Sequence, residues 1–222
     1  MTRLFERNPG PQPLDRPLDW PDARAGLIRK LSERLGPLGL HYKTAMDFFE
    51  EESDDEGLRR TFRIHDPGMG RPLTAHWGYG LDFVPHLVGG RIGWHRTFAT
   101  ARRDLWIVSR DGKPEAHRAL GREVYISSIY RVIDDGVAQA QAFWAATRSL
   151  EAVTGVLLRA SWQLRAAPGS ESHIARRSPL SLPFALERLG APGGEALLEE
   201  TLRAIQLSPG TVARVRDAFD MI

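Results

Sequence analysis

Strict alternation of apolar and polar residues marks two segments in the first half of the chain as β-strands. In 73–83 the odd positions carry the large apolar side chains and the even positions carry small or polar ones, whereas in 91–98 the even positions Ile92, Trp94 and Phe98 are apolar. A period of two is typical of strands with one face in the core. With a turn over 85–90, the pattern predicts an antiparallel hairpin of 73–84 with 91–98, whose paired positions sum to an odd number near 175.

Weaker patterns complete the predicted sheet. Apolar runs or alternation favour strands at 40–49, 58–65 and 105–108. Residues 121–133 fit both a strand and a helix, and their β-branched residues favour a strand in the first half. The sequence therefore predicts about five to six antiparallel strands and leaves the state of 121–133 open.

Apolar residues at helical spacing predict helices on both sides of these strands. Leu27, Leu31 and Leu35 lie on one face of an N-terminal helix that ends at Gly36. A long helix is predicted to begin at Asp134 or Asp135 and to run to about residue 164, with a bend at Gly155. Three short helices are predicted near 182–189, 193–206 and 210–220.

These elements predict an α+β fold: an N-terminal helix, an antiparallel sheet of about five to six strands, a long helix packed on the sheet, and a small C-terminal helical subdomain. The predicted divisions are an extended Pro-rich arm over 1–21, an α+β core domain over 22–165, a loop over 166–180 and a helical appendage over 181–222. The prolines before residue 21 are the reason for predicting an arm.

Composition narrows the possible functions. The absence of cysteine excludes disulfides, thiolate zinc sites and cysteine nucleophiles. The first 13 residues lack the apolar stretch of a signal peptide, and no later segment is apolar enough to span a bilayer, so we expect a cytoplasmic protein without membrane contact. The net charge of only +2 argues against nucleic-acid binding.

Charge is unevenly distributed along the chain. Acidic residues crowd the segment that contains Glu50, Glu51, Glu52, Asp54 and Asp55, and basic residues outnumber acids over 91–131. We expect the acidic run to be exposed, because burying several unpaired carboxylates would cost more than the net stability of a typical fold. Either segment is a candidate surface for a protein partner.

Sequence motifs that define common catalytic families are missing. The chain has no phosphate loop, no dinucleotide fingerprint, no nucleophile elbow and no His-Glu-x-x-His zinc motif. No cofactor is therefore predicted. A metal site at His76 and Asp82 is not expected either, because six residues of a strand separate them by about 20 Å.

One set of polar residues shares the second face of the predicted hairpin. It comprises His76, Asp82, Arg91 and His95. In a catalytic interpretation Asp82 orients His95 as a general base and Arg91 holds an anionic substrate. The alternative is a solvent-facing surface, or a surface on which the long helix packs through the glycines at 78 and 80, and this alternative is favoured.

The order of helix, antiparallel strands and long helix, with the segments LDFVPH (81–86) and GWHRT (93–97), resembles uncharacterised bacterial α+β protein families. Some of these look like immunity or accessory proteins of toxin systems. The resemblance covers about half of the chain and transfers no functional residue.

Two hypotheses of function remain. The favoured hypothesis is a non-enzymatic binding or interaction protein. Immunity-like inhibition of a partner is one form of such a function. The alternative is an enzyme that acts on an anionic substrate at the 73–98 hairpin face. A pocket at that face would favour the enzyme, and a flat or covered face would favour the binding protein.

Overall fold

A computed structural model of the chain describes residues 17–65, 74–101, 104–108, 123–166, 174–176 and 178–222. Its centre is a six-stranded antiparallel sheet in the order β10-β8-β5-β4-β3-β2. The strands are β2 (His41–Lys43), β3 (Phe48–Glu50), β4 (Leu58–His65), β5 (Thr74–Leu81), β8 (Leu105–Val108) and β10 (Ile174–Arg176). The predicted strand count is confirmed, although 40–49 contains two strands rather than one, joined through Asp47 at φ 59°.

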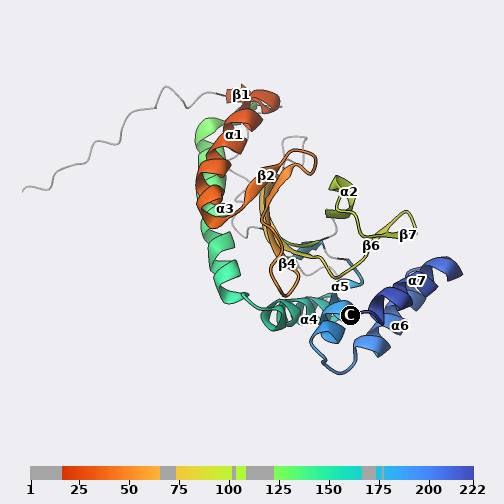
Figure 1. Cartoon of the computed structure of the whole chain (residues 1–222). Helices are drawn as coiled ribbons and strands as arrows, with labels where there is room; N and C mark the ends of the chain where they lie inside the picture. The colour runs from red at the N-terminus through yellow and green to blue at the C-terminus, as the bar shows by residue number, and fades with distance from the viewer. Residues whose placement is uncertain (1–16, 66–73, 102–103, 109–122, 167–173, 177) are drawn as a thin grey trace, which may run out of the picture.

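Helices cover one side of this sheet. Helices α1 (Trp20–Leu35) and α3 (Ile126–Ala146) lie side by side along it (Figure 1). Gly136 allows α3 to approach closely, since a Cβ atom there would lie 2.3 Å from the Cβ of Ala75 in β5. The predicted N-terminal helix is confirmed, with Leu27, Leu31 and Leu35 buried on its inner face. A short 3₁₀ helix, η1 (Gly36–Leu38), follows it.

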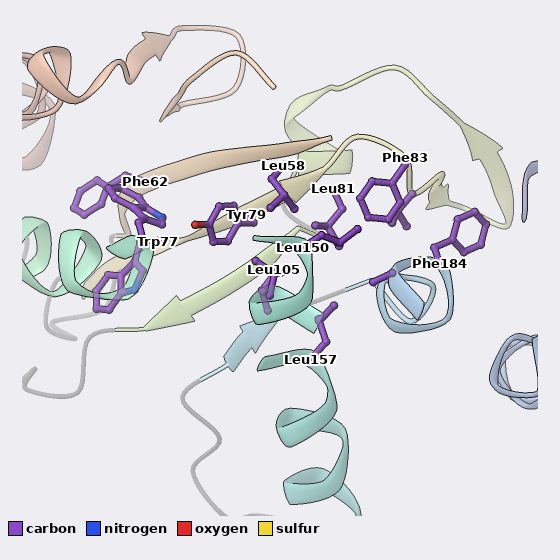
Figure 2. Packing of buried hydrophobic residues seen from close by; sticks show 14 of the residues in the cluster. Leu58, Phe62, Trp77, Tyr79, Leu81, Phe83, Leu105, Leu150, Leu157 and Phe184 are labelled. Carbon is purple, nitrogen blue, oxygen red and sulfur yellow. The ribbon is translucent and has the colours of Figure 1, made fainter. Parts of the chain in front are cut away.

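Strands β4 and β5 form the longest pair, from Leu58 opposite Leu81 to His65 opposite Thr74. Their alternating apolar residues face the helices, where Phe62, Trp77 and Tyr79 are buried. Figure 2 shows this apolar layer continuing through β8 to α4 (Leu150–Ala166) and to Phe184. The predicted core positions Trp77, Leu81 and Phe83 are confirmed.

The predicted hairpin of 73–84 with 91–98 is wrong. Strand β5 pairs with β4 and β8, while β7 (Arg91–Gly93) pairs with β6 (His86–Val88) in a separate two-stranded sheet. A two-residue turn of Gly89 and Gly90, both at positive φ, lets 86–88 fold back locally. The paired positions, such as Leu87 with Ile92, still sum to an odd number, but Trp94 is 51% exposed instead of buried.

A small two-stranded sheet and a short helix cover the opposite side of the main sheet. Strands β6 and β7 and the short helix α2 (Phe98–Ala101) lie on the side away from α1 and α3 (Figure 1). Their chain connects β5 to β8, the next strand in the sheet. Both faces of β5 are therefore buried, including His76, Gly78 and Gly80 on the face predicted to be polar.

The ambiguous segment 121–133 contains both predicted states. Residues 123–125 form β9 (Glu123–Tyr125), and α3 begins at Ile126. Strand β9 pairs with β1 (Pro17–Asp19), so within the predicted arm over 1–21 residues 17–19 form a strand and residues 20–21 begin α1. Residues 1–16 of that arm lie outside the described residues.

The predicted long helix is two helices, α3 and α4, because the chain turns at 147–149. The Oγ1 of Thr147 donates to the carbonyl of Phe143 and ends α3. Two side-chain acceptors then satisfy the first amides of α4: Glu56 accepts from Leu150 at 2.5 Å, and Ser149 accepts from Ala152 at 3.3 Å. These local caps, rather than a bend at Gly155, redirect the helix.

The three C-terminal helices are confirmed as α5 (Ser181–Arg188), α6 (Gly194–Ala204) and α7 (Pro209–Phe219). Helix α5 packs on α4, and Thr211 of α7 donates to the carbonyl of Gly90 at 2.9 Å. Buried residues of all three helices belong to the main core. The division of the chain into arm, core, loop and appendage stays a prediction, although residues 174–176 of the predicted loop form β10.

The α+β fold class is confirmed: an N-terminal helix, a six-stranded antiparallel sheet, helices packed on it and a C-terminal group of helices. Among the described helices, none has the length and apolar character needed to cross a membrane.

Candidate functional site

The structure does not bring the four predicted site residues together. His76 is buried in β5, with Nδ1 3.2 Å from the guanidinium of Arg63 and Nε2 3.0 Å from the hydroxyl of Thr74. Arg91 and His95 are exposed in and after β7. Because β7 does not pair with β5, His95 does not lie opposite Gly80, and the predicted contact with Asp82 has no basis in the strand register.

Asp82 instead belongs to a cluster of five charged side chains between the sheet and the segment that carries α2. We call this cluster the Arg96 network; its members are Glu50, Arg59, Asp82, Arg96 and Asp104. Arg96 donates to Glu50 at 2.9 Å and to Asp104 at 2.8 Å. Arg59 donates to Asp82 at 2.5 Å, and this pair joins the others through contacts of 3.7 Å to Glu50 and 3.9 Å to Arg96.

Small and aromatic residues make room for Arg96 inside the protein. A Cβ atom at Gly80 would lie 2.6 Å from Nη1 of Arg96, so a larger residue there would displace the guanidinium. The guanidinium also lies 5.9 Å from the ring centre of Phe48. The glycine in β5 therefore serves a buried ion pair, not the packing of a helix as the sequence alternative proposed.

Burial shapes the protonation of the network. Burial raises the pKa of Asp104 to about 7, against which the attraction of Arg96 acts only in part. For Asp82, hydrogen bonding and charge attraction from Arg59 outweigh burial and hold the pKa below its usual value. Three carboxylates face two guanidinium groups, so the fully ionised network carries an excess negative charge, and a proton on Asp104 removes it.

A buried histidine lies within the field of this network. Burial, with the positive charge of Arg96, lowers the pKa of His86 to about 4, and Asp82 opposes this shift. His86 is therefore neutral at physiological pH. It contributes a polar but uncharged group beside the network.

A cleft of about 460 Å³ opens elsewhere, on the helix side of the sheet. It is lined by Leu38, Glu51, Glu52, Asp54, Arg60, Tyr79, Gln141, Trp144, Ala145 and Arg148. None of the four predicted site residues and no member of the Arg96 network lines it. The volume falls within the range of about 300–1,000 Å³ that is usual for ligand pockets.

Arg60 and its partners build one wall of the cleft. Its Nε donates to Glu51 at 2.7 Å, another nitrogen donates to the carbonyl of Leu38 at 2.8 Å, and its guanidinium lies 5.5 Å from the ring of Trp144. Tyr79 donates its hydroxyl to the carbonyl of Thr147 at 2.7 Å. These side chains are fixed before any ligand arrives, which lowers the entropic cost of binding.

The remaining charged residues of the cleft are less engaged. The side chain of Glu52 is 86% exposed, with contacts of 3.5 Å to Lys43 and 3.9 Å to Arg59. Asp54 uses Oδ1 to accept from the amides of Glu56 and Leu58. Within the part of the chain that the structure describes, Arg148 forms no ion pair.

The prediction that the whole acidic run is exposed is wrong at its first two residues. Glu50 is only 3% exposed and Glu51 is partly buried, because Arg96 and Arg60 supply their counter-charges. Glu52, Asp54 and Asp55 are exposed as predicted. Of the basic segment over 91–131, Arg91 and Arg131 are exposed, Arg96 is in the network, and 102–103 and 109–122 lie outside the described residues.

Sequence reasoning missed Glu50, Arg96 and Asp104 as a unit. One signal was available: Arg96 falls in the apolar phase of 91–98, between Trp94 and Phe98, where a charged residue needs a buried partner. Glu50 directly after two phenylalanines carries a similar signal. The cleft had no such signal, because the residues that line it come from five separate segments of the chain.

Comparisons with protein-family models, with curated proteins and with solved structures find no match to this chain. Among the described residues, no group of three or more His, Asp or Glu side chains is arranged to hold a metal ion.

Proposed function

We propose that this chain is a non-enzymatic cytoplasmic binding protein whose partner docks at the cleft between the acidic turn and the end of α3. The main support for the proposal is that two sets of charged side chains differ in whether they form ion pairs inside the protein. Charges of the Arg96 network pair with one another inside the protein, whereas Glu52 and Arg148 stand at the mouth of an open cleft. Charges available to a partner lie at the cleft.

The residue types around the cleft also support a protein partner. Arg60, whose side chain is 30% exposed, is of a kind enriched among residues that dominate binding energy at interfaces, and the buried rings of Trp144 and Tyr79 line the cleft behind it. Exposed polar groups, Glu52 and Gln141, surround them as the polar rim of an interface does. Immunity-like inhibition of a toxin is one form that such binding takes.

The alternative, an enzyme acting on an anion at the 73–98 face, has weaker support. The hairpin on which it rested does not form, and its four residues are dispersed. One feature favours it: Asp104 titrates near neutral pH, as catalytic acids do. Asp104 is engaged by Arg96 and does not line the cleft, so this feature supports a structural role.

A pair of photo-crosslinking variants tests the proposal in the native host. A photoreactive amino acid at Gln141, which lines the cleft, should capture a protein, whereas the same residue at the exposed neighbouring position 142 should not. The captured protein is then purified, and its affinity is measured by calorimetry with the full chain. Glu52→Lys should weaken binding about tenfold or more, while Glu33→Lys on the exposed side of α1 should not.

Equal capture at both positions, or an affinity that Glu52→Lys leaves unchanged, would contradict docking at the cleft. Turnover of an anionic substrate that is lost in Asp104→Asn, in a chain that still folds, would replace the binding protein by the enzyme.

A further inference from the structure

We infer that the β6–β7 hairpin and the adjoining part of α7 form a second docking surface, which binds an acidic segment of a protein. We call it the Trp94 surface; its members are Val88, Arg91, Trp94 and Arg214. The hairpin lies on the side of the sheet away from α1 and α3, whereas the cleft lies on their side (Figure 1). The Trp94 surface is therefore separate from the cleft and goes beyond the proposed function.

The hairpin exposes two large apolar side chains. Trp94 is 51% exposed and Val88 is 38% exposed, and among the described residues only three other large apolar side chains are exposed. Tryptophan and arginine are enriched among the residues that dominate binding energy at protein interfaces. The ring of Trp94 is thus an apolar anchor that the fold leaves half uncovered.

Two arginines flank the point where the hairpin touches α7. Oγ1 of Thr211 donates to the carbonyl of Gly90 at 2.9 Å. Arg91 follows Gly90, and Arg214 lies one helical turn beyond Thr211, where its Nε is 3.4 Å from the carbonyl of Gly210. Both arginines are exposed, and within the described part of the chain neither forms an ion pair. Guanidinium groups without counter-charges suit a carboxylate partner.

The segment that carries the hairpin supplies no acid of its own. Residues 83–101 contain neither Asp nor Glu. The acids on either side of this segment, Asp82 and Asp104, are held by Arg59 and Arg96 within the Arg96 network. The outer surface of the segment is therefore positive, and a partner has to supply the negative charge.

The surroundings favour a short acidic segment over a nucleic acid or an anionic membrane. Two arginines match one or two carboxylates, whereas binding to a polyanion or an anionic membrane depends on many cations. The whole chain has a net charge of only +2. Helix α6 carries Glu195, Glu199 and Glu200 and contacts α7 through Glu199 and Arg216 at 2.8 Å. An extended polyanion would meet these carboxylates beyond the two arginines.

The spacing of the surface sets the form of the acidic segment. Arg91 lies three residues before Trp94, a separation of about 10 Å in an extended chain. A bound peptide in extended form covers this span with about three residues. An acidic residue at one end of the span and a large apolar residue at the other would contact Arg91 and Trp94 together.

Titration of the isotope-labelled full-length chain with the peptide Ac-EDLEDL-NH2 tests the inference by NMR. The indole N–H signal of Trp94, assigned by its absence in Trp94→Phe, should shift saturably, together with the amides of Gly90 and Arg91. The analogue Ac-QNLQNL-NH2 has the same size but no charge, and its binding should be weaker by about tenfold or more. No shift up to about 10 mM acidic peptide would overturn the inference.

Matched arginine variants locate the binding site. Arg91→Gln and Arg214→Gln should each weaken binding of the acidic peptide about two- to fivefold, the scale of exposed ion pairs. Arg131→Gln, which removes an exposed arginine on α3, should leave the affinity unchanged. Because all three side chains are exposed, the melting temperature should stay that of the native chain. Equal weakening by all three variants would show attraction to net charge alone and would overturn the inference.

Two further probes distinguish the class of partner. A single-stranded deoxythymidine oligonucleotide represents nucleic acid, and vesicles of phosphatidylserine and phosphatidylcholine represent a membrane. Tighter binding of either probe than of the acidic peptide, at the same salt concentration, would overturn a protein as the partner.

Failure of this inference is distinguishable from failure of the proposed function. Glu52→Lys at the cleft should leave binding of the acidic peptide unchanged, and a changed affinity would place the peptide at the cleft and overturn the inference. If position 141 captures a partner but the peptide does not bind, only the Trp94 surface fails. If the peptide binds with the expected response to Arg91→Gln and position 141 captures nothing, only docking at the cleft fails.

Discussion

The sheet face that packs against the helices carries Leu58, Phe62 and Tyr79, whereas the opposite face carries Glu50, Arg59 and the glycine that accommodates Arg96. Both faces are buried. Apolar packing on the first face is non-directional and depends on the area removed from water. Ion pairing on the second face depends on geometry, because each buried charge must meet an opposite one.

The difference between the two faces predicts which single substitutions should lower the stability of the fold most. On the helix face, loss of one side chain leaves a cavity that neighbours partly fill. In the Arg96 network, loss of one partner leaves an uncompensated charge. We expect the free energy of unfolding to respond differently to single substitutions, to pH and to combined substitutions on the two faces.

Arg96→Met should have the largest effect. Glu50 and Asp104 would lose their shared counter-charge while still buried, which should reduce the free energy of unfolding by about 3–5 kcal/mol at neutral pH. Urea unfolding measures the change. The triple variant that also carries Glu50→Leu and Asp104→Leu removes the stranded charges and should be more stable than Arg96→Met alone. A triple variant no more stable than the single one would show that the loss comes from packing.

Leu105→Ala probes the apolar face of β8. The side chain is fully buried among β5 and α4 (Figure 2), and its loss should cost about 2–5 kcal/mol. No charge is involved, so the cost should be the same at pH 5 and pH 7.5, whereas the cost of Arg96→Met should change between these values. Urea titrations of both variants at both pH values make the comparison. A pH-dependent cost for Leu105→Ala would break the distinction between the faces.

The same difference explains how far the sequence could predict the structure. Alternation identified β4 and β5 because one apolar face suffices to produce a period of two. The pairing of β5 with β8 was missed because the apolar positions of 91–98 have the parity expected of a partner for β5, but that segment pairs with β6 instead. Strands β5 and β8 pair odd positions with odd ones, such as Trp77 with Ile107. The Arg96 network was missed because ion pairs between residues 50, 96 and 104 leave no periodic pattern. A cleft formed by five segments leaves none either.

Two buried groups, Asp104 and His86, have pKa values shifted in opposite directions, so each should make the stability depend on pH with the opposite slope. The folded-state pKa of Asp104, about 7, lies above its ordinary value of 3.8, so its contribution to stability is present below about pH 4 and is lost as pH rises to 7. The folded-state pKa of His86, about 4, lies below 6.5, so its contribution is present above pH 6.5 and is lost as pH falls to 4. The two slopes oppose each other in the native chain.

Replacing one of the two groups should leave only the pH dependence that the other group contributes. In Asp104→Asn the free energy of unfolding should rise with pH between 4 and 6.5, and in His86→Gln it should fall with pH between 4 and 7, each by a few kcal/mol. Urea unfolding at half-unit pH steps measures both. Parallel profiles in the two variants would show that neither group is the source of the pH dependence.

Arg34→Met should have the smallest effect and sets the scale for Arg96→Met. Arg34 in α1 pairs with Asp134 in α3 at 2.8 Å, the same separation as between Arg96 and Asp104, but about half of each side chain is exposed. Water and salt screen this pair, and Asp134 becomes hydrated when its partner is removed, so the expected loss is below about 1 kcal/mol. The substitution is chemically identical to Arg96→Met, which leaves burial as the variable. Urea unfolding in 50 mM and 500 mM salt measures both variants, and added salt should reduce the small cost at Arg34 while leaving most of the cost at Arg96. Equal costs at the two positions would mean that burial does not set the strength of the network, and the contrast between the two faces of the sheet would fail.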